Sequence, residues 1–584
     1  MRVTIFSRLL VVIFITNGFG QNGTRLASEN YLPSADHSVQ SFPVSPRAMA
    51  EWEEAQGILI TWTSVPNTPN LNDISDVYIE IVRHAQAEGM VYLITDIPDE
   101  VKYYLSKNKI LLDRIRFLNI GFNSIWCRDY GPQSIYTEDV NYLCFVDWIY
   151  DEYRGTDDMI SQALAKYLNI PVFEIIKPPL DLAFAGGNFM TDGQNTAFAS
   201  RKVLWDNIRK SETEVDAIFW NYLGIQRFIK LKNLPEDPLQ HIDTYIKLLN
   251  EETLLVGQYP PGVPNRREIE SNIEYIQTNF KSCHGRPYKI VRIPMPPYRE
   301  TGLFFGHNGE YPSYTNSMII NRTVLVPLFH PQYDSTALRI YHEQMPGYKI
   351  IGISSYHLIP TGGTLHCLIK EIGAHNPILI AHAPLTTQAD TSNGYLIKAC
   401  IKSKVGIDYA AVIWHPQSLS QPFQTELKYA GNDTFYAKIP SQPAGKTVKY
   451  YLKASDFMGK MITKPMSAPE GYWQFKVDFS TNTRQEIATQ NGKFELRQNY
   501  PNPFNSITTI RYEIKQPCQV QMKIYNATGR QVRTLVERSH APGIYSVKWA
   551  GEDDGGRPVS SGIYYYKLQT DQNESLRKRL LYLK

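Results

Sequence analysis

The sequence predicts an α/β domain followed by β-rich domains, and three observations support this. From residue 49 onward, short apolar runs typical of buried strands alternate with segments that have helical apolar spacing. After about residue 385 the helical segments stop, and turn residues separate short alternating runs. The chain has 584 residues, which is too long for one ordinary hydrophobic core and suggests about three domains.

The first domain, expected over residues 44–384, is built from these patterns in chain order. Val77 and Ile81 recur at helical spacing, which predicts a helix at residues 76–88. A second helix is predicted at residues 335–345. Apolar runs of strand length predict strands at residues 57–62, 90–94, 318–320, 323–327 and 349–353.

The segment 385–478 is expected to form an immunoglobulin-like sandwich. Residues 448–454 and 472–477 are predicted strands with turn signals between the runs. Residues 479–493 are polar and poor in apolar side chains, so they are expected to be a linker.

The last segment, residues 494–584, is expected to be a small β-sandwich. In one of its predicted strands, Val520, Met522 and Ile524 alternate with polar residues and are expected on one face.

Residues 1–20 are expected to be a secretory signal peptide. A positively charged start precedes an apolar core at residues 9–15, which is too short to span a bilayer. Residues 21–43 are polar and expected to be loose. No later stretch is apolar enough for a transmembrane helix, so the mature chain is expected to be exported through the periplasm to the cell surface or the medium.

Composition gives no sign of a nucleic-acid or membrane partner. The formal net charge is +3, and 20% of residues are charged, which is ordinary for a soluble globular protein. Six cysteines occur without Cys-x-x-Cys spacing, so a zinc site or redox pair is not expected. Their pairing stays open, because exported proteins can form disulfides whereas a nucleophilic cysteine must remain free.

Four separated segments carry the residue types that attack on a guanidine requires. A guanidinium is planar and cationic, so a catalyst must bind the cation, supply a strong nucleophile and protonate a departing amine. Asp129 and Asp243 are the candidates for binding the cation through bidentate hydrogen bonds. Cys367 is the candidate nucleophile. His241 is the candidate acid–base residue, and His366, which directly precedes Cys367, is the alternative.

Asn316 is the candidate that holds the imidazole or the intermediate by hydrogen bonds. The spacing of His241 and Asp243 predicts that a strand end presents both to one pocket, since residues two apart on a strand share a face. Two unpaired carboxylates, Asp129 and Asp243, would repel each other there, and a cationic substrate would remove the conflict.

In this order along the chain, residues 126–132, 241–243, 313–317 and 361–367 resemble the guanidino-group-modifying superfamily, in the branch of bacterial peptidylarginine deiminases and agmatine deiminases. A Gly-Gly-Asn turn at residues 186–188 lies where the family has a similar turn. The resemblance implies a fivefold pseudosymmetric α/β propeller of ββαβ units (the pentein fold), with the site on its axis. It also implies a covalent thiouronium on Cys367, hydrolysis aided by His241, no cofactor or metal, and substrate contacts from Trp126 and Arg154.

Three departures from the family pattern bear on the substrate. Residues 368–371 read Leu-Ile-Lys-Glu where agmatine deiminases typically have Ile-Thr-Gln-Gln, and Ala185 stands where they carry a glutamate. These two departures, at residues 368–371 and at Ala185, disfavour agmatine as the substrate. Arg154 is the only arginine in a loop where the secreted peptidylarginine deiminases of this branch carry two, so C-terminal arginine is expected to be preferred less strictly.

The C-terminal segment resembles the sorting domain of the type IX secretion system. The resemblance lies at residues 496–505, 524–529, 543–545 and 561–566. It implies the type IX secretion machinery as a partner. The alternative is a carbohydrate-binding or adhesion sandwich.

We therefore expect an exported cysteine-dependent hydrolase that converts peptidyl-arginine to citrulline and releases ammonia. Three alternatives remain. The first is a deiminase of agmatine or free arginine, which export disfavours. The second is a Cys-His-Asn peptidase, which the two additional aspartates disfavour. The third is an inactive surface-binding protein that keeps the fold, which the intact set of site residues disfavours.

Overall fold

The structure is a computed structural model. It describes residues 42–63, 71–151, 153–299, 301–304, 311–389, 393–416, 421–478, 494–499, 501–571 and 575–583. The expected signal peptide, nearly all of the expected loose segment and the expected linker lie outside these residues. Two compact units are distinguished, one of Met1–Thr386, Tyr395–Ile439 and Thr447–Phe475, the other of Thr387–Gly394, Pro440–Lys446 and Lys476–Lys584.

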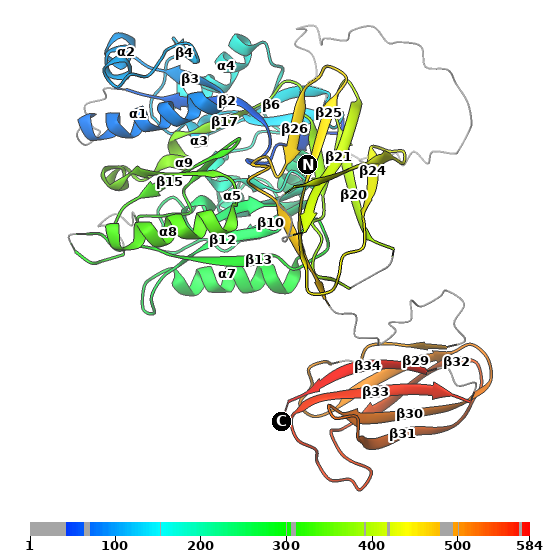
Figure 1. The fold of residues 1–584 in the computed structure, drawn as a ribbon. Coiled ribbons are helices and arrows are strands. Elements are labelled where there is room, and N and C mark those ends of the chain that lie inside the picture. Colours follow the sequence, from blue (N-terminus) through cyan, green and yellow to red (C-terminus); the bar gives the residue numbers. More distant parts are fainter. Residues whose placement is uncertain are drawn as a thin grey trace, which may run out of the picture. The chain divides into compact units, whose positions relative to one another are not determined.

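Five small sheets of the described residues build the first domain (Figure 1). In four of them an antiparallel strand pair is followed by a helix and a strand that adds in parallel. The first of these blades consists of β5 (Gln133–Thr137), β6 (Tyr142–Trp148), α4 (Ile160–Leu168) and β7 (Val172–Ile175), and the second consists of β8 (Met190–Thr191), β9 (Thr196–Ser200), α5 (Lys202–Asp206), α6 (Glu212–Leu223) and β10 (Arg227–Leu231). The third consists of β11 (Ile246–Asn250), β12 (Thr253–Gln258), α7 (Arg266–Asn279) and β13 (Lys289–Pro294). The fourth consists of β14 (Met318–Ile320), β15 (Thr323–Leu328), α8 (Pro331–Gln344) and β16 (Lys349–Ser354).

The fifth blade joins the two ends of the domain. Its strands and helices are β2 (Ala55–Thr61), α1 (Leu71–Glu88), β3 (Met90–Ile94), α2 (Pro98–Lys107) and β4 (Ile115–Leu118). The last strand of the domain, β17 (Lys370–Gly373), pairs antiparallel with β2 and supplies the missing first strand. The repeated order confirms the prediction of a fivefold ββαβ propeller.

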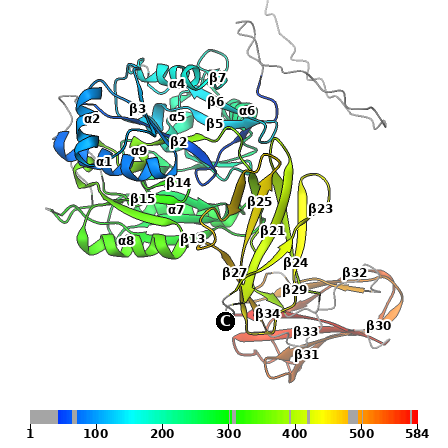
Figure 2. The same cartoon turned by 45° about the horizontal axis from the view of Figure 1, so that its top comes forward.

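Helices lie on the outside of the sheets, as Figures 1 and 2 show for α1, α2, α4 and α8. The predicted apolar stripe of α1 is buried, with Val77 3% exposed and Ile81 fully covered. Burial of one stripe against a sheet stabilises such a helix more than its intrinsic propensity does. The blade that contains β5 also includes the short strand β1 (Arg47–Ala48), which pairs with β5, and the 3-10 turn η1 (Asp157–Met159).

A two-sheet β-sandwich follows the propeller. One sheet has the order β18 (Leu379–His382), β20 (Tyr395–Lys402), β24 (Thr434–Ile439), β23 (Lys428–Tyr429). The other has the order β27 (Trp473–Asp478), β25 (Thr447–Asp456), β21 (Ile407–Pro416), β22 (Phe423–Glu426), with β26 (Met461–Lys464) on β25 and β19 (Gln388–Ala389) on β27. Strand β18 is the first strand of the sandwich, so the sandwich begins before the boundary expected at residue 385.

Two ion pairs connect the sandwich to the propeller within the first unit. Lys460 Nζ lies 2.7 Å from Glu54 Oε1, and Lys464 Nζ lies 3.0 Å from Glu251 Oε1. A two-sheet arrangement agrees with the predicted sandwich, and its immunoglobulin-like character stays a prediction.

The C-terminal β domain has one sheet of β28 (Phe494–Leu496), β29 (Thr508–Ile514) and β32 (Gly543–Trp549). Its second sheet has the order β31 (Gln531–His540), β30 (Cys518–Asn526), β33 (Gly562–Thr570), β34 (Ser575–Tyr582). Val520, Met522 and Ile524 are at most 2% exposed, which confirms that one face of β30 carries the core.

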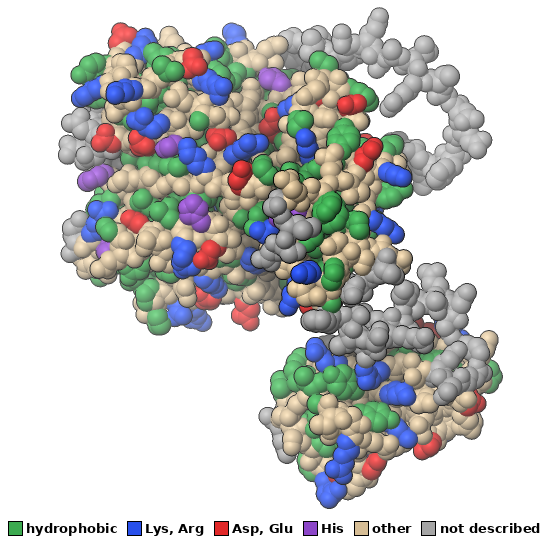
Figure 3. Space-filling model, viewed as in Figure 1, with side chains coloured by type: hydrophobic (Ala, Val, Ile, Leu, Met, Phe, Trp, Pro, Cys, Tyr) green, Lys and Arg blue, Asp and Glu red, His purple; other side chains and the backbone are tan. Residues whose placement is uncertain are grey.

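Three further observations concern the surface, the cysteines and the described helices. Basic and acidic side chains are interspersed over the face drawn in Figure 3. All six cysteines are unpaired. Among the described helices, none combines the length and the apolar character needed to cross a membrane.

Candidate active site

The residues predicted to take part in catalysis lie on, or directly before, short turns that precede the first strand of a blade. The turns are α3 (Cys127–Tyr130) before β5, η2 (Gly186–Asn188) before β8, η3 (Ile242–Thr244) before β11, residues 313–316 before β14, and α9 (Leu365–Leu368) before β17. Equivalent positions in a closed ring of blades meet at one end of its axis. This explains how segments far apart in the sequence build one site.

Asn316 links three parts of the site. Its side-chain oxygen accepts hydrogen bonds from Thr364 Oγ1 at 2.7 Å and from the His366 backbone N–H at 3.0 Å. Its amide nitrogen therefore faces the other way, where it donates to Asp243 Oδ2 at 3.1 Å and to Cys367 Sγ at 3.4 Å. Asn316 thus holds the cysteine turn against Asp243, and the predicted hydrogen bond to the imidazole or the intermediate stays a prediction.

Cys367 lies at the C-terminal side of this turn and is 4% exposed. Its Sγ is 3.9 Å from Asp243 Oδ2. Burial, followed by the negative charges of Asp243 and Asp129, raises the pKa of the Cys367 thiol well above its usual range. Without a positive ligand, the sulfur is therefore a thiol at neutral pH.

Asp243 is fully buried and has one paired and one unpaired oxygen. Oδ2 accepts from Asn316 and lies 2.8 Å from His366 Nδ1. Oδ1 has no hydrogen-bond partner among the described residues. Burial favours the neutral acid, but the hydrogen bond and charge of His366 outweigh it, so the pKa of Asp243 lies below its ordinary value. A buried, ionised oxygen without a donor is a binding position for a cationic N–H group.

Asp129 is the second carboxylate and lies in a different electrostatic environment. Its Oδ1 accepts from the Gly187 backbone N–H at 2.9 Å and lies 3.7 Å from His241 Nδ1. Burial raises the pKa of Asp129, and the charge of His241 offsets this only in part. Asp129 is therefore the carboxylate that gains most from a cationic ligand.

Gly187 is required where three side chains converge. A Cβ at this position would lie 2.7 Å from His241 Nδ1, 2.9 Å from Asp129 Oδ1 and 3.1 Å from Asp243 Oδ2. Any larger residue would displace one of these groups. The Gly-Gly-Asn turn noted in the sequence is thus part of the site.

The structure corrects two expectations about His241 and Asp243. The prediction of a strand is wrong: Ile242–Thr244 form the 3-10 turn η3, and His241 is the extended residue before it. The Thr244 hydroxyl donates to the His241 carbonyl at 2.6 Å and closes this turn, which the two-residue spacing did not reveal. The expectation of two unpaired carboxylates is also wrong, because Asp243 is paired with His366.

Trp126 and Arg154 occupy different positions relative to Cys367. A Cβ on Gly363 would lie 2.5 Å from Trp126 Cζ3 and 2.9 Å from Cys367 Cβ, so the indole borders the cysteine turn. Arg154 donates to the Tyr150 hydroxyl at 2.9 Å and lies 3.5 Å from Asp151, outside the lining of the pocket at Cys367. Its predicted contact with substrate stays a prediction.

A pocket of about 230 Å³ opens beside Cys367. Asp237 is the one charged side chain among its described lining residues; its Oδ2 accepts from the Tyr311 hydroxyl at 3.0 Å. The lining residues are Asp237, Pro238, Leu239, Thr244, Tyr311, Ser313, Asn316, Ile359, Pro360, Gly362, Gly363, Thr364 and Cys367. The wall is therefore mainly apolar with one acidic position.

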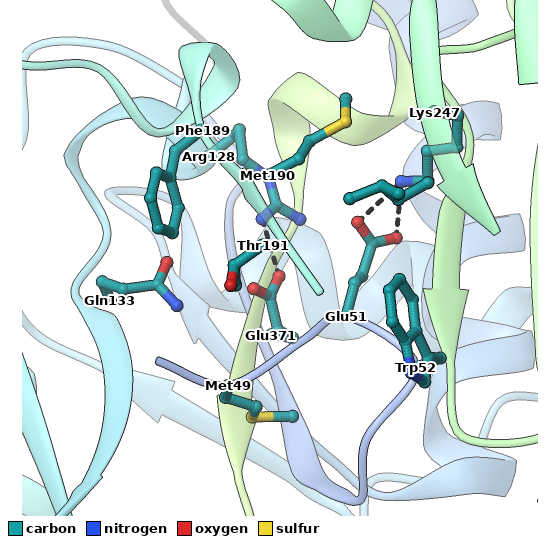
Figure 4. Close-up of a pocket in the computed structure, with 11 residues that line it drawn as sticks. Met49, Glu51, Trp52, Arg128, Gln133, Phe189, Met190, Thr191, Lys247 and Glu371 are labelled. Carbon is teal, nitrogen blue, oxygen red and sulfur yellow. Dashed lines mark hydrogen bonds and ion pairs between the residues drawn. The ribbon is translucent and has the colours of Figure 1, made fainter. Parts of the chain in front are cut away.

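A second group of buried charges, the axial cluster, comprises Glu51, Arg128, Lys247 and Glu371. Lys247 Nζ lies 2.6 Å from Glu51, and Arg128 Nη1 lies 2.7 Å from Glu371, as the dashed lines in Figure 4 show. Arg128 therefore pairs with Glu371 and not with its sequence neighbour Asp129. The cluster lines a cavity of about 20 Å³, which has room for about one water molecule.

The sequence alone did not assign a role to Glu51. His366 Nε2 lies 3.1 Å from Glu51 Oε2. The two residues are 315 positions apart, so no local pattern connects them. No group of three or more His, Cys, Asp or Glu side chains in the described part of the chain is arranged to hold a metal ion.

Two family models match the chain. Residues 47–372 match the Porphyromonas-type peptidyl-arginine deiminase, and residues 505–574 match the FlgD Ig-like domain. A Legionella pneumophila protein named an agmatine deiminase is 24% identical over 337 residues, which cover 55% of this chain and 93% of that protein. A Vibrio parahaemolyticus protein of the same name is 24% identical over 294 residues, covering 46% of this chain and 80% of its own.

Two solved structures share the fold. The agmatine deiminase of Enterococcus faecalis is 18% identical and has a TM-score of 0.51, covering 58% of this chain and 99% of its own. A Porphyromonas gingivalis protein solved as an arginine deiminase is 21% identical and has a TM-score of 0.50, covering 56% of this chain and 98% of its own. At these identities, the likeness shows the α/β propeller and no more.

The match over residues 47–372 spans more than half of the 584 residues and includes all five turns of the site. The family supports a hydrolase that acts on guanidino C–N bonds. From the five-bladed fold, the convergence at Cys367 and this match, the chain belongs to the Porphyromonas-type peptidyl-arginine deiminase family.

Proposed function

We propose that this chain is an exported deiminase that converts arginine side chains of peptides or proteins to citrulline. The observation that carries the proposal is the buried and unpaired Oδ1 of the Asp243 carboxylate, whose other oxygen, Oδ2, lies 3.9 Å from the Cys367 sulfur. A guanidinium offers the N–H groups that this oxygen lacks, and its central carbon would then lie near the sulfur.

Binding of the cation activates the nucleophile. The negative charges of Asp129 and Asp243 both raise the pKa of the Cys367 thiol. A guanidinium between them neutralises that field, so the pKa falls and the thiolate forms only when substrate is present. The sulfur then attacks the guanidinium carbon and gives a tetrahedral adduct.

Proton transfer completes two half-reactions. His241 donates a proton to the departing nitrogen, and the carbon–nitrogen bond breaks. Ammonia departs, and a thiouronium remains attached to Cys367. His241 then takes a proton from water, which attacks the same carbon and displaces the sulfur. One water is consumed, and one guanidinium becomes one ureido group and one ammonium ion.

The surroundings of Cys367 oppose the peptidase alternative. A cysteine peptidase needs an imidazole hydrogen-bonded to its thiol. In the described part of the chain, the recorded polar contacts of Cys367 Sγ are to Asn316 and Asp243, and His241 faces Asp129. Carboxylates beside a thiol oppose ionisation and suit a cationic substrate instead.

Agmatine is the second candidate substrate, and Asp237 favours it. An acidic position in the pocket wall suits a tail that is cationic or neutral, whereas a C-terminal or free arginine carries a carboxylate. Ala185 and the residues after Cys367 favour the peptidyl reading instead. An arginine inside a peptide has no nearby carboxylate, so it agrees with both observations.

The substrate is tested by kcat/KM for one peptide with arginine at its C-terminus, then amidated, then with arginine internal, alongside agmatine. The peptidyl proposal expects the peptides to exceed agmatine. Arg154→Ala should reduce any advantage of the free C-terminus by about one or two decades, the worth of one charged hydrogen bond. If agmatine exceeds every peptide, the peptidyl proposal is wrong and the second candidate replaces it.

Delivery to the outside is a separate proposal about the C-terminal domain. The self-contained sheets from Phe494 onward and the resemblance to a type IX sorting domain support it. A chain that ends before residue 494 should remain active but fail to reach the cell surface. Culture fractions of the full and shortened chains test this, and delivery of the shortened chain would refute the sorting role.

A further inference from the structure

His366 lies directly before the proposed nucleophile, and both of its ring nitrogens face carboxylates. Its side chain is 1% exposed; Nδ1 lies 2.8 Å from Asp243 Oδ2 and Nε2 lies 3.1 Å from Glu51 Oε2. A carboxylate oxygen only accepts hydrogen bonds, and a neutral imidazole has a single N–H. Both contacts are hydrogen bonds only when the ring is an imidazolium, so the geometry indicates a positively charged His366.

Glu51 is also fixed by groups other than His366. Lys247 Nζ lies 2.6 Å from both of its carboxylate oxygens, and the Ile319 backbone N–H donates to Oε1 at 2.7 Å. Burial raises the carboxyl pKa, but Lys247 and His366 outweigh it and hold the pKa of Glu51 far below its usual value. Glu51 is therefore an ionised acceptor held in place by groups outside the substrate site.

The contact with His366 determines which oxygen of Asp243 is available. Oδ2 is shared by His366 Nδ1 and the Asn316 amide, at 2.8 and 3.1 Å. Oδ1 is buried and without a partner among the described residues. If the ring were absent, the carboxylate would lose its strongest donor and could rotate.

We propose that Glu51 and His366 are positioning residues, in which Glu51 holds the His366 ring as a cation and that ring presents the free oxygen of Asp243 to the guanidinium. The inference rests on the proposed deiminase function and assigns roles to two residues that do not contact the substrate. Both N–H groups of the His366 imidazolium are held by carboxylates, so neither is free to donate a proton to the substrate, and the cation has no lone pair to accept one. Proton transfer therefore belongs to His241.

Several other charged or titratable groups surround these two residues. Those that act on Asp243 and Glu51 are His241, Asp129, Arg128, Cys367, Lys247, Lys370 and Glu371. All of them are retained in the variants used for the pH profiles below, and the binding measurement replaces Cys367 alone, in every protein compared. A change in pH dependence therefore reports on the Glu51–His366–Asp243 connection.

The test compares Glu51→Gln and His366→Gln with the wild type. Without the imidazolium, burial dominates at Asp243, its pKa rises, and the carboxylate is lost at a higher pH. The acidic limb of the pH profile of kcat/KM should therefore move to higher pH. Because cation binding is weakened, KM should rise about tenfold, and kcat should fall by a smaller factor. Glu51→Asp keeps the charge and should recover part of the loss.

Glu53→Gln is the matched control. Glu53 is also a buried acid on the same segment, paired with Arg47 at 2.6 Å, and its side chain is 10% exposed against 13% for Glu51. It should lower the melting temperature without moving the acidic limb. If Glu53→Gln moves the limb as far as Glu51→Gln does, the effect is a general loss of stability and the proposal is overturned.

A binding measurement separates this proposal from the proposed function. Calorimetry with methylguanidinium on Cys367→Ser reports affinity without turnover. Adding Glu51→Gln should weaken the affinity about tenfold, and adding Glu53→Gln should leave it unchanged. If the wild type turns over no guanidine but this difference is found, the proposed function fails and the positioning role stands. Equal affinity in all three proteins overturns the positioning role.

Discussion

The two groups of buried charges in the propeller, the active site and the axial cluster, differ in how their charges are paired. In the axial cluster each charge has an opposite charge close by, at 2.6 Å for Glu51 and Lys247 and at 2.7 Å for Arg128 and Glu371. In the active site, Asp243 keeps one buried oxygen without a donor among the described residues. Similar burial therefore gives a structural network in one place and an incomplete binding site in the other.

The difference shows where a ligand is needed. A buried ion pair is complete without a ligand, although it adds little net stability over a well-packed apolar pair. A buried carboxylate oxygen without a donor, such as Asp243 Oδ1, costs free energy until a donor arrives. Substitutions at Asp129 and Asp243 should therefore affect mainly activity, whereas breaking the Arg128–Glu371 pair should affect mainly stability.

Cys367→Ser should have the largest effect. A hydroxyl is far less nucleophilic than a thiolate near neutral pH, so release of citrulline should be abolished while the fold is kept. Product formation and thermal melting are measured on the same sample. Cys400→Ser, on strand β20 of the sandwich, is the control and should retain activity. Retained activity in Cys367→Ser would disprove the nucleophile assignment.

Asp129→Asn and Asp243→Asn should each lower kcat/KM. The expected loss of transition-state stabilisation is about 2–5 kcal/mol, the cost of truncating one partner of a buried charge pair. Stability should respond differently. Because burial raises the pKa of Asp129, its ionised form is unfavourable at neutral pH, and Asp129→Asn should raise the melting temperature. A variant within a few-fold of wild-type activity would make that carboxylate structural.

Glu371→Gln should have the opposite pattern. Breaking the buried pair leaves Arg128 without its carboxylate, which costs about 3–5 kcal/mol of unfolding free energy. Urea unfolding measures the loss, compared with Asp129→Asn. If Glu371→Gln is as stable as the wild type while Asp129→Asn is destabilised, the contrast between the two regions is wrong.

A smaller effect is expected on the reactivity of the free thiol. Since the pKa of Cys367 is raised, less thiolate is present at neutral pH, and alkylation by iodoacetamide should be slower than for free cysteine. The rate should rise as pH increases. Asp129→Asn removes one of the charges that raise the pKa and should speed alkylation, whereas Asp237→Asn should change it little. Peptide mapping assigns the modified cysteine.

Much of the fold was predictable because local patterns agreed with it. The strand β3 lies at the residues expected from its apolar run, and the stripe of α1 is buried as its spacing indicated. The five blades themselves came from resemblance, since periodicity gave only an α/β class. The turn at His241 was missed because it is closed by Thr244, a contact that a two-residue spacing does not encode.

The candidate site was predictable where one segment carries a recognisable group of residues. Asp129, Asp243, Asn316 and Cys367 are brought together as expected. Glu51 was not assigned a role, because its partner His366 is 315 residues away and only the closure of the ring by β17 brings them together.

The most direct test of the central claim is detection of the covalent intermediate. Wild-type protein is mixed with an arginine-containing peptide, quenched in acid within the first turnovers, and digested for mass spectrometry. The account predicts an adduct on the peptide that carries Cys367, with the mass of the substrate minus ammonia, followed by citrulline in the released product. Citrulline formation without any adduct on Cys367, or an adduct on another cysteine, would contradict it.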